Sequence, residues 1–222
     1  MKISDTIRER IQQAGGNFYA NHNISEHLQP GEMELLTKEV AEQFAGVLNS
    51  LVIDTQNDHN TQDTANRVAK MFVQEIFSGR YLSAPKITSF PNVTEYDQLY
   101  VTGPITIRSM CAHHMMPISG RAYVGVFPGR NVIGLSKFNR LVDWVATRPQ
   151  IQEEMTIQVA DIIERETEAE GVAVLIQAEH GCMTMRGVKE HDSDMTTSVM
   201  RGVFRDTPHL KKEFFDIVSR MK

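Results

Sequence analysis

Apolar residues recur at helical spacing in two segments of the first third of the chain. They fall on one helical face within residues 33–53, and a second such segment runs from about residue 64 to Ser78-Gly79, where a helix end is expected. The apolar positions are Leu36, Val40, Phe44, Val47 and Leu51 in the first segment, and Val68, Met71, Phe72 and Ile76 in the second. The pattern predicts two helices joined by a polar connector, residues 54–63.

Residues 1–31 are polar and weakly patterned, and they end in the turn signal Gln29-Pro30-Gly31. We expect a variable N-terminal arm with room for one short helix. Residues 32–84, which hold the two predicted helices, form a helical appendage to the rest of the chain.

The pattern changes after Pro85, where β-branched and aromatic residues bounded by glycine and proline predict strands. We expect strands at 99–107, 121–127 and 172–178, with 182–188 as the partner of the last. Ser136 is expected to cap a helix, Pro149 to begin another, and 210–221 to form a third. The first two helices bury Phe138, Leu141, Val142 and Val145, and Ile151, Met155, Val159 and Ile162.

This order of strand, strand, helix, helix, strand, strand is typical of the α+β class, in which helices cover one face of an antiparallel sheet. The sequence therefore predicts three parts, which are an arm (1–31), a helical appendage (32–84) and a sheet domain (85–222).

Composition narrows the class of protein. With 222 residues, 41% of them apolar and 23% charged, the chain has enough apolar material for a core. No apolar run approaches the length of a membrane span, and residues 1–12 lack the apolar stretch of a signal peptide, so we expect a cytoplasmic protein with cysteines as thiols. A net charge of −5 argues against a nucleic-acid partner, and any anionic ligand needs a local basic cluster.

Both cysteines stand beside histidines. Cys111 begins Cys-Ala-His-His, and Cys182 follows His180 by two residues. Zinc prefers these ligands, and Cys-x-x-His with one distant cysteine supplies three of them, the number typical of a catalytic zinc site. Neighbouring side chains of an extended chain point apart, so the spacing favours His114 as ligand and leaves His113 for proton transfer. The alternative is a pair of buried cysteines with ordinary polar histidines.

The predicted strand 182–188 adds a second group. His180, Cys182, Thr184 and Arg186 share parity, so an extended chain presents them on one side of the sheet. A base, a ligand and a guanidinium group then line one groove. A half-buried strand with a polar outer face explains the same alternation.

Basic residues gather at the start of the Ser136 helix. Lys137 and Arg140 lie beside the free N–H groups of its first turn, which makes an anion site whose usual occupant is phosphate. A solvated basic helix start is the alternative. Arg67 and Lys70, three residues apart, are surface neighbours on the earlier helix.

Gln152-Glu153 stands at the start of the helix that follows Pro149. A carboxylate there accepts from two N–H groups, as it does from a guanine edge. A glutamate that only complements the helix dipole is the simpler explanation.

Together these residues resemble the GTP cyclohydrolase I family. The matching runs are Arg67-Val-Ala-Lys-Met71, Glu75-Ile-Phe-Ser-Gly79, Pro85-Lys-Ile-Thr88, Cys111-Ala-His-His114, Ile133-Gly-Leu-Ser-Lys137, Arg148-Pro-Gln150 and Arg186-Gly187. The resemblance covers about 33–220. It implies a tunnelling fold, a homodecamer of two pentamers with active sites at subunit interfaces, and conversion of GTP to 7,8-dihydroneopterin triphosphate with release of formate.

The resemblance also implies a role for each matching residue. Cys111, His114 and Cys182 bind Zn²⁺, and His113 and His180 transfer protons. Glu153 with Gln152 holds the guanine of GTP. The triphosphate is held by Ser136, Lys137, Arg140, Arg186, Arg67 and Lys70.

One departure from the family pattern affects the metal site. The family usually has Cys-Glu-His-His, whereas this chain has Ala112 in place of the glutamate. Losing a carboxylate there raises the local potential. Two alternatives therefore stay open: a paralogue that opens the purine ring to a different product or uses another metal, and a non-catalytic module that binds zinc or a nucleotide.

Overall fold

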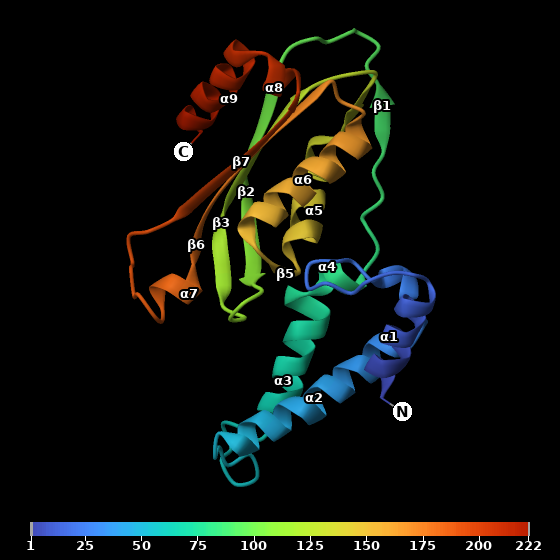
Figure 1. The fold of residues 1–222 in the computed structure, drawn as a ribbon, viewed down its shortest axis with the longest axis vertical. Coiled ribbons are helices and arrows are strands. Elements are labelled where there is room, and N and C mark those ends of the chain that lie inside the picture. The colour runs from blue at the N-terminus through green and yellow to red at the C-terminus, as the bar shows by residue number, and fades with distance from the viewer. Residues whose placement is uncertain (1, 222) are drawn as a thin grey trace. The chain divides into compact units, whose positions relative to one another are not determined.

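The computed structural model describes residues 2–221, which divide into two compact units, the first ending at Ser83 and the second beginning at Ala84 (Figure 1). The first unit is helical: α1 (Ile3–Gln13), a 3-10 helix (Ser25–His27), α2 (Glu32–Ser50), α3 (Thr64–Lys70), a π-helical segment (Met71–Ile76) and α4 (Ser78–Tyr81). In the part of the chain described here, no helix combines the length and the apolar character needed to cross a bilayer.

Residues on both sides of the Pro30-Gly31 turn pack together within the first unit. On α1, Ile7 and Ile11 are buried against Ile24. Arg10 of α1 donates to both carboxylate oxygens of Glu32, at 2.9 and 2.8 Å. The N-terminal segment is therefore tied to the start of α2, and its helix α1 is three turns long.

Only part of the predicted apolar face of the first helix is covered. In α2, Leu36, Ala41 and Leu48 are buried together with Glu32, whereas Val47 and the C-cap residue Leu51 are 48% and 63% exposed. The expectation for the end of the second helix was wrong: α3 passes into the π-helical segment, and Gly79 lies inside α4 instead of ending a helix. A glycine ends a helix only where it adopts a left-handed cap.

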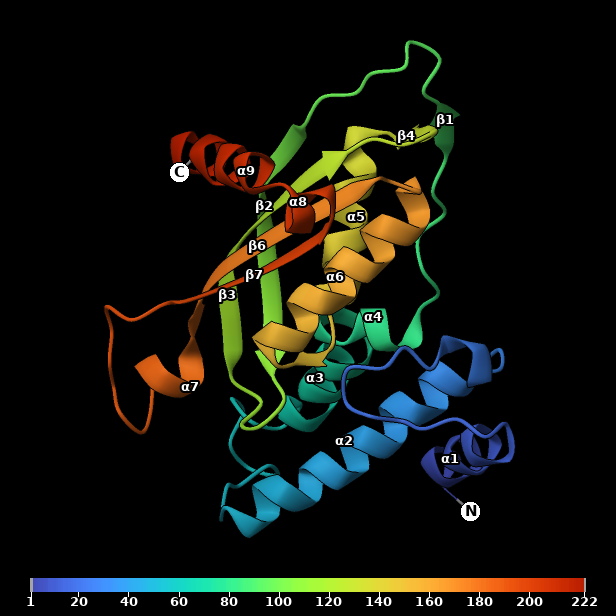
Figure 2. The same ribbon diagram turned by 45° about the horizontal axis from the view of Figure 1, so that its top comes forward.

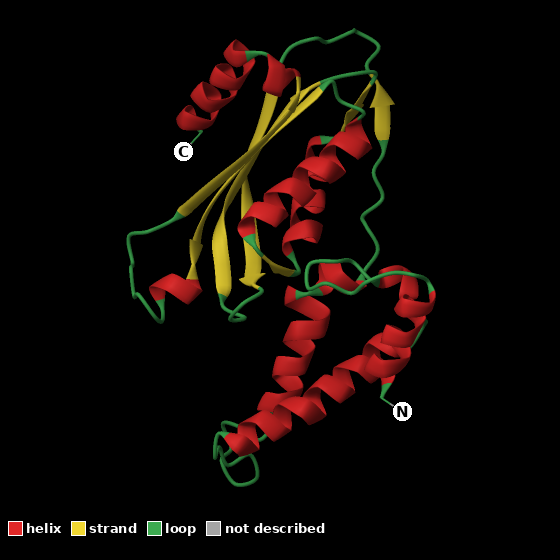
Figure 3. Cartoon of the chain, viewed as in Figure 1, coloured by secondary structure: helices red, strands yellow, loops and turns green. Residues whose placement is uncertain are grey.

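The second unit is built on a five-stranded sheet (Figure 3). Its elements are β1 (Ser89–Pro91), β2 (Tyr100–Cys111), β3 (Pro117–Phe127), β4 (Asn131–Ile133), α5 (Leu135–Ala146), β5 (Pro149–Gln150), α6 (Gln152–Thr167), β6 (Gly171–His180), α7 (Gly181–Thr184), β7 (Met195–Gly202), α8 (Val203–Asp206) and α9 (Pro208–Arg220). The strand order is β5-β2-β3-β6-β7, antiparallel except for β5 with β2, and β1 pairs separately with β4. The class is α+β.

Helices lie on both faces of this sheet (Figure 2). Along β6, Val172, Val174 and Ile176 belong to the core shared with α5 and α6, whereas Ala173 and Leu175 belong to the core shared with α8 and α9. Strand residues alternate between faces, so a strand covered on both sides must be apolar throughout. This explains the continuous apolar run from Val172 to Ile176.

Two helix starts differ from the sequence expectation. Ser136 is not the cap of α5, because the helix begins one residue earlier and Gly134 is its N-cap. Pro149 does not begin a helix: Pro149-Gln150 is the short strand β5, which pairs parallel with Met110 and Cys111, and α6 begins at Gln152. Proline fits either place, since its missing N–H is tolerated at the edge of a sheet as well as in a first helical turn.

The segment 182–188 is not the strand partner of β6. Its first residues form the helical turn α7, and the partner strand is β7, Met195–Gly202, in antiparallel register with residues 171–178. The parity of residues 180–186 therefore does not place them on one face. The composition of β7, with Thr196, Thr197 and Val199, carried a β-branched signal.

Candidate metal and proton-transfer site

A tight turn presents the first two ligand candidates. Cys111 ends β2, its N–H donates to the Met116 carbonyl at 2.8 Å, and its own carbonyl accepts from Met115 N–H at 2.9 Å. Met115 has a positive φ of 51°. The Ala112 N–H donates to the Gln150 carbonyl at 2.9 Å, so β5 holds the start of the turn. This turn carries His113 and His114 away from the strand direction.

A second turn brings Cys182 to the same place. Strand β6 ends at His180, and at Gly181 a Cβ atom would come within 3.1 Å of the Pro117 carbonyl oxygen. The glycine therefore permits a close approach to β3. The Met185 N–H donates to the Gly181 carbonyl at 3.0 Å and closes α7.

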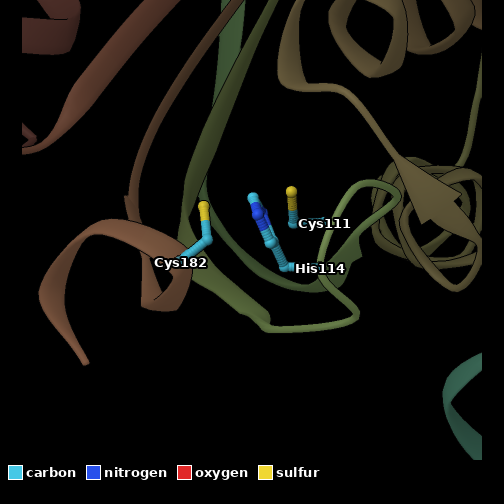
Figure 4. Close-up of side chains that lie close together, drawn as sticks. All are labelled: Cys111, His114 and Cys182. Atoms are coloured by element: carbon cyan, nitrogen blue, oxygen red, sulfur yellow. The ribbon is translucent and has the colours of Figure 1, made fainter. Parts of the chain in front are cut away.

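Cys111, His114 and Cys182 converge, with one ligand atom of each lying within 4.8 Å of the others (Figure 4). Both cysteines are free thiols. Cys111 is buried, Cys182 half-buried and His114 exposed, so the group is open on one side. Two sulfurs and one imidazole nitrogen suit tetrahedral zinc with a fourth position for water or substrate.

The surroundings of Cys182 change the pKa of its thiol. Burial raises its pKa, and the neighbouring Cys111 raises it further by a hydrogen bond and by charge, while Arg186 acts in the opposite direction. Two thiolates side by side are costly without a cation, and a bound cation reverses that balance. The chemistry of this donor set therefore fits a metal ion.

His113 does not belong to the group of three. Its side chain is exposed, and its ring lies 6.4 Å from the His114 ring, centre to centre and at 90°. His113 therefore lies beside the group of three on the same turn, with its ring perpendicular to that of His114.

His180 is held by Gln152. The His180 Nε2 and the Gln152 Oε1 lie 2.7 Å apart, and Gln152 is fully buried. Burial lowers the pKa of the His180 imidazole, and the Glu153 carboxylate acts in the opposite direction, so Glu153 lies close enough for its charge to act on the ring. Glu153 itself is exposed on the first turn of α6.

The amide nitrogen of Gln152 faces acceptors only. It donates to the carbonyls of Ile176 and Met195 at 3.1 and 2.8 Å and to Thr197 Oγ1 at 3.2 Å. Sequence reasoning missed these contacts because it had not located β7. They differ from the guanine contact that the family resemblance implies for Gln152.

Arg186 contacts a ligand candidate directly. Its Nη1 lies 3.1 Å from the His114 Nε2. Both side chains are exposed, and Gly187, next along the chain, has a positive φ of 65°. The guanidinium group thus stands at the open side of the group of three.

The other residues predicted to bind the triphosphate fall into two sets. Ser136, Lys137 and Arg140 lie on the first turns of α5; the Lys137 Nζ donates to the Lys86 carbonyl at 3.2 Å, and Arg140 lines an open cavity of about 320 Å³. Arg67 and Lys70 belong to the first unit, on α3, where Arg67 pairs with Asp63 at 3.3 Å.

Known proteins match this chain over most of its length. The family model for GTP cyclohydrolase I matches residues 36–219. A GTP cyclohydrolase 1 of Flavobacterium johnsoniae is 38% identical over 209 residues, which cover 92% of this chain and 93% of that protein. Another from Photobacterium profundum is 41% identical and covers 76% of this chain and 78% of that protein.

A solved structure, the apo form of an archaeosine synthase QueF-Like, is 15% identical, with a TM-score of 0.38 over 47% of this chain and 92% of that one. That likeness is too weak to carry weight. The sequence matches decide the family: this chain belongs to the GTP cyclohydrolase I family.

Proposed function

We propose that this chain converts GTP to 7,8-dihydroneopterin triphosphate with release of formate, as a zinc-dependent hydrolase. The observation that carries the proposal is the convergence of Cys111, His114 and Cys182 within 4.8 Å beside a histidine held by a buried amide. Membership of the family supports the substrate and the product.

The metal role falls to the three converging side chains. Cys111 and Cys182 supply thiolates, and His114 supplies one ring nitrogen. When bound, zinc supplies a Lewis acid that lowers the pKa of water toward neutrality. The exposed side of the group leaves room for water and for C8 of the purine.

Two histidines move protons in this proposal. His180, with its Nε2 on the Gln152 oxygen, keeps Nδ1 for exchange with substrate. His113 lies exposed beside His114 and has both ring nitrogens available for the ring-opening steps. Imidazole suits this work because its pKa lies near neutral pH.

Substrate placement uses the remaining predicted residues. Glu153, exposed at the start of α6, accepts from the guanine edge, and Gln152 takes part through His180. Ser136, Lys137, Arg140 and Arg186, with Arg67 and Lys70, bind the triphosphate; charge-assisted contacts of this kind are the strong ones.

The proposal also covers the domains of the chain and its assembly into an oligomer. We infer a tunnelling fold in which residues 85–222 form the catalytic domain, 32–84 the helical appendage and 1–31 a variable arm. Protomers form a decamer of two pentamers with active sites at their interfaces. A cytoplasmic location remains a prediction from composition.

Product analysis of the purified, zinc-loaded protein with GTP tests the proposal. Formate together with neopterin fluorescence after oxidation is the expected result. Formate without a pterin points to a paralogue with a different product, and neither product with zinc bound points to a non-catalytic zinc or nucleotide-binding module. Either of these outcomes overturns the proposal.

Single variants separate the assigned roles. His113→Ala is expected to keep the metal and lose turnover, whereas Cys182→Ser is expected to lose both. His209→Ala, an exposed histidine on α9, serves as the matched control. A His113→Ala protein that makes pterin at the full rate contradicts the role of His113.

A further inference from the structure

A second arginine shares the cavity that Arg140 lines. The open cavity of about 320 Å³ lies between β2 and α5 and is lined by Ile105, Thr106, Arg108, Asn139, Arg140 and Asp143. Arg108 comes from β2, three residues before Cys111, and no motif in the sequence singled it out. Two guanidinium groups and one carboxylate thus face one cavity.

Both arginines are available to a ligand. Their side chains are exposed, and neither forms an ion pair or a hydrogen bond with any of residues 2–221. Asp143, at i+3 from Arg140 on α5, does not come within ion-pair distance of either group in the described chain. Two other arginines of this unit do form ion pairs: Arg165 pairs with Glu166, and Arg201 pairs with Asp161 and Glu164.

The lining suits an oxyanion with several charges. Guanidinium groups bind phosphate oxygens in pairs of parallel hydrogen bonds, and Thr106 and Asn139 add uncharged donors at the same cavity. Two guanidinium groups outweigh the single carboxylate, so the local field is positive in a chain whose net charge is −5. A polyphosphate chain presents several anionic oxygens along its length, enough for both guanidinium groups.

We propose that Arg108 is a further substrate-binding residue, which together with Arg140 binds the triphosphate of the substrate. The assignment rests on the proposed function, which gives Arg140 that ligand. Both guanidinium groups come from one chain, so the pair stays together whichever protomer supplies the metal ligands. Arg108 acts on binding and not on the reacting purine.

Calorimetric titration with inorganic tripolyphosphate tests the pair without requiring turnover. Arg108→Ala is expected to weaken binding about fivefold to tenfold and to flatten its dependence on NaCl concentration. Arg108→Lys keeps the charge but loses the paired hydrogen bonds, so an intermediate affinity is expected. Arg140→Ala is the positive control.

Arg121→Ala is the matched control. Arg121 is an exposed arginine of β3, in register with Thr106, and it does not line the cavity. The Arg121→Ala substitution removes the same charge from the same sheet. The affinity of this variant for tripolyphosphate should stay within about twofold of the wild type. Equal losses in the Arg108 and Arg121 variants show a general field effect and overturn the proposal.

Steady-state kinetics separate this proposal from the proposed function. If the wild type makes neopterin, Arg108→Ala should raise KM for GTP with kcat nearly unchanged, which a folding defect does not produce. If the wild type forms product but Arg108→Ala has the same tripolyphosphate affinity and the same KM, only the arginine pair is refuted. A wild type that forms no product refutes the proposed function, and the titration still decides the pair.

Discussion

The Gln152 side chain joins His180 to the edge strand β7. Its oxygen lies 2.7 Å from the His180 Nε2, and its nitrogen donates to the Met195 carbonyl at 2.8 Å. Because the amide nitrogen faces acceptors, the oxygen must face the ring, and an oxygen accepts only from an N–H. His180 is therefore held with its proton on Nε2 and a lone pair on Nδ1.

Replacing Gln152 tests this tautomer. In Gln152→Ala we expect kcat for formate release to fall about tenfold to hundredfold, the usual effect of losing a group that orients a working histidine. KM for GTP should change little, because the ring and not the guanine loses its partner. Stopped assays of formate with zinc-loaded protein measure both constants.

The matched control is Gln177→Ala. Gln177 is an amide on the same strand as His180, and its Nε2 donates to Asp194 at 2.6 Å. The Gln177→Ala substitution should leave kcat for formate release unchanged. A Gln152→Ala protein with normal kcat but raised KM shows instead that Gln152 binds guanine, as the family resemblance implies.

Arg186 and a metal compete for His114. Whichever ring nitrogen binds the metal, the neutral imidazole has no free lone pair left to accept from Arg186. Arg186→Ala should therefore strengthen zinc binding about fivefold, the equivalent of roughly 1 kcal/mol for one hydrogen bond, while it weakens the binding of tripolyphosphate.

Competition with a zinc chelator measures the first effect and tripolyphosphate titration the second. Lys189→Gln removes a charge three residues further along the same segment, and this variant should change neither affinity. Weaker zinc binding in Arg186→Ala contradicts the competition.

Restoring the carboxylate beside Cys111 tests the meaning of Ala112. A glutamate there attracts the cation, so Ala112→Glu should bind zinc roughly fivefold more tightly. Ala112→Gln, of the same size without the charge, is the control. Equal zinc affinities of the two variants, measured by the same competition, show that this position does not act through charge.

Acid should loosen the first unit through Glu32. The hydrogen bonds that Arg10 donates lower the pKa of this carboxyl most strongly. Burial raises the pKa, and a hydrogen bond from the Gln29 N–H lowers it again. A lowered pKa in the folded state gives stability that is present at neutral pH and lost as the pH falls through that value. Glu32→Gln should therefore be less stable at pH 7 and show a smaller loss on acidification.

Urea unfolding at pH 7 and at about pH 4 measures the difference. Glu34→Gln, an exposed carboxyl of the same helical turn, is the control and should follow the wild type. If the two variants respond alike to acid, Glu32 has no special part in the pH dependence.

The sequence by itself determined the ligand types, the family and the order of the main elements. The Cys-x-x-His spacing predicted that Cys111 and His114 share one turn, which is local information, and the residue type alone suggested Cys182 as the third ligand. The β-branched and apolar residues from Val172 to Ile176 likewise predicted a strand, since strand propensity depends on the local sequence.

Only the tertiary structure decided what lies beside what. Strand parity placed His180, Cys182 and Arg186 on one face, whereas a close approach of Gly181 to Pro117 turns the chain into α7 and brings Cys182 to Cys111. The hydrogen bonds of Gln152, and the cavity that Arg108 and Arg140 both line, bring together residues far apart in the sequence. Such contacts depend on backbone packing between elements, which the periodicity of one segment does not encode.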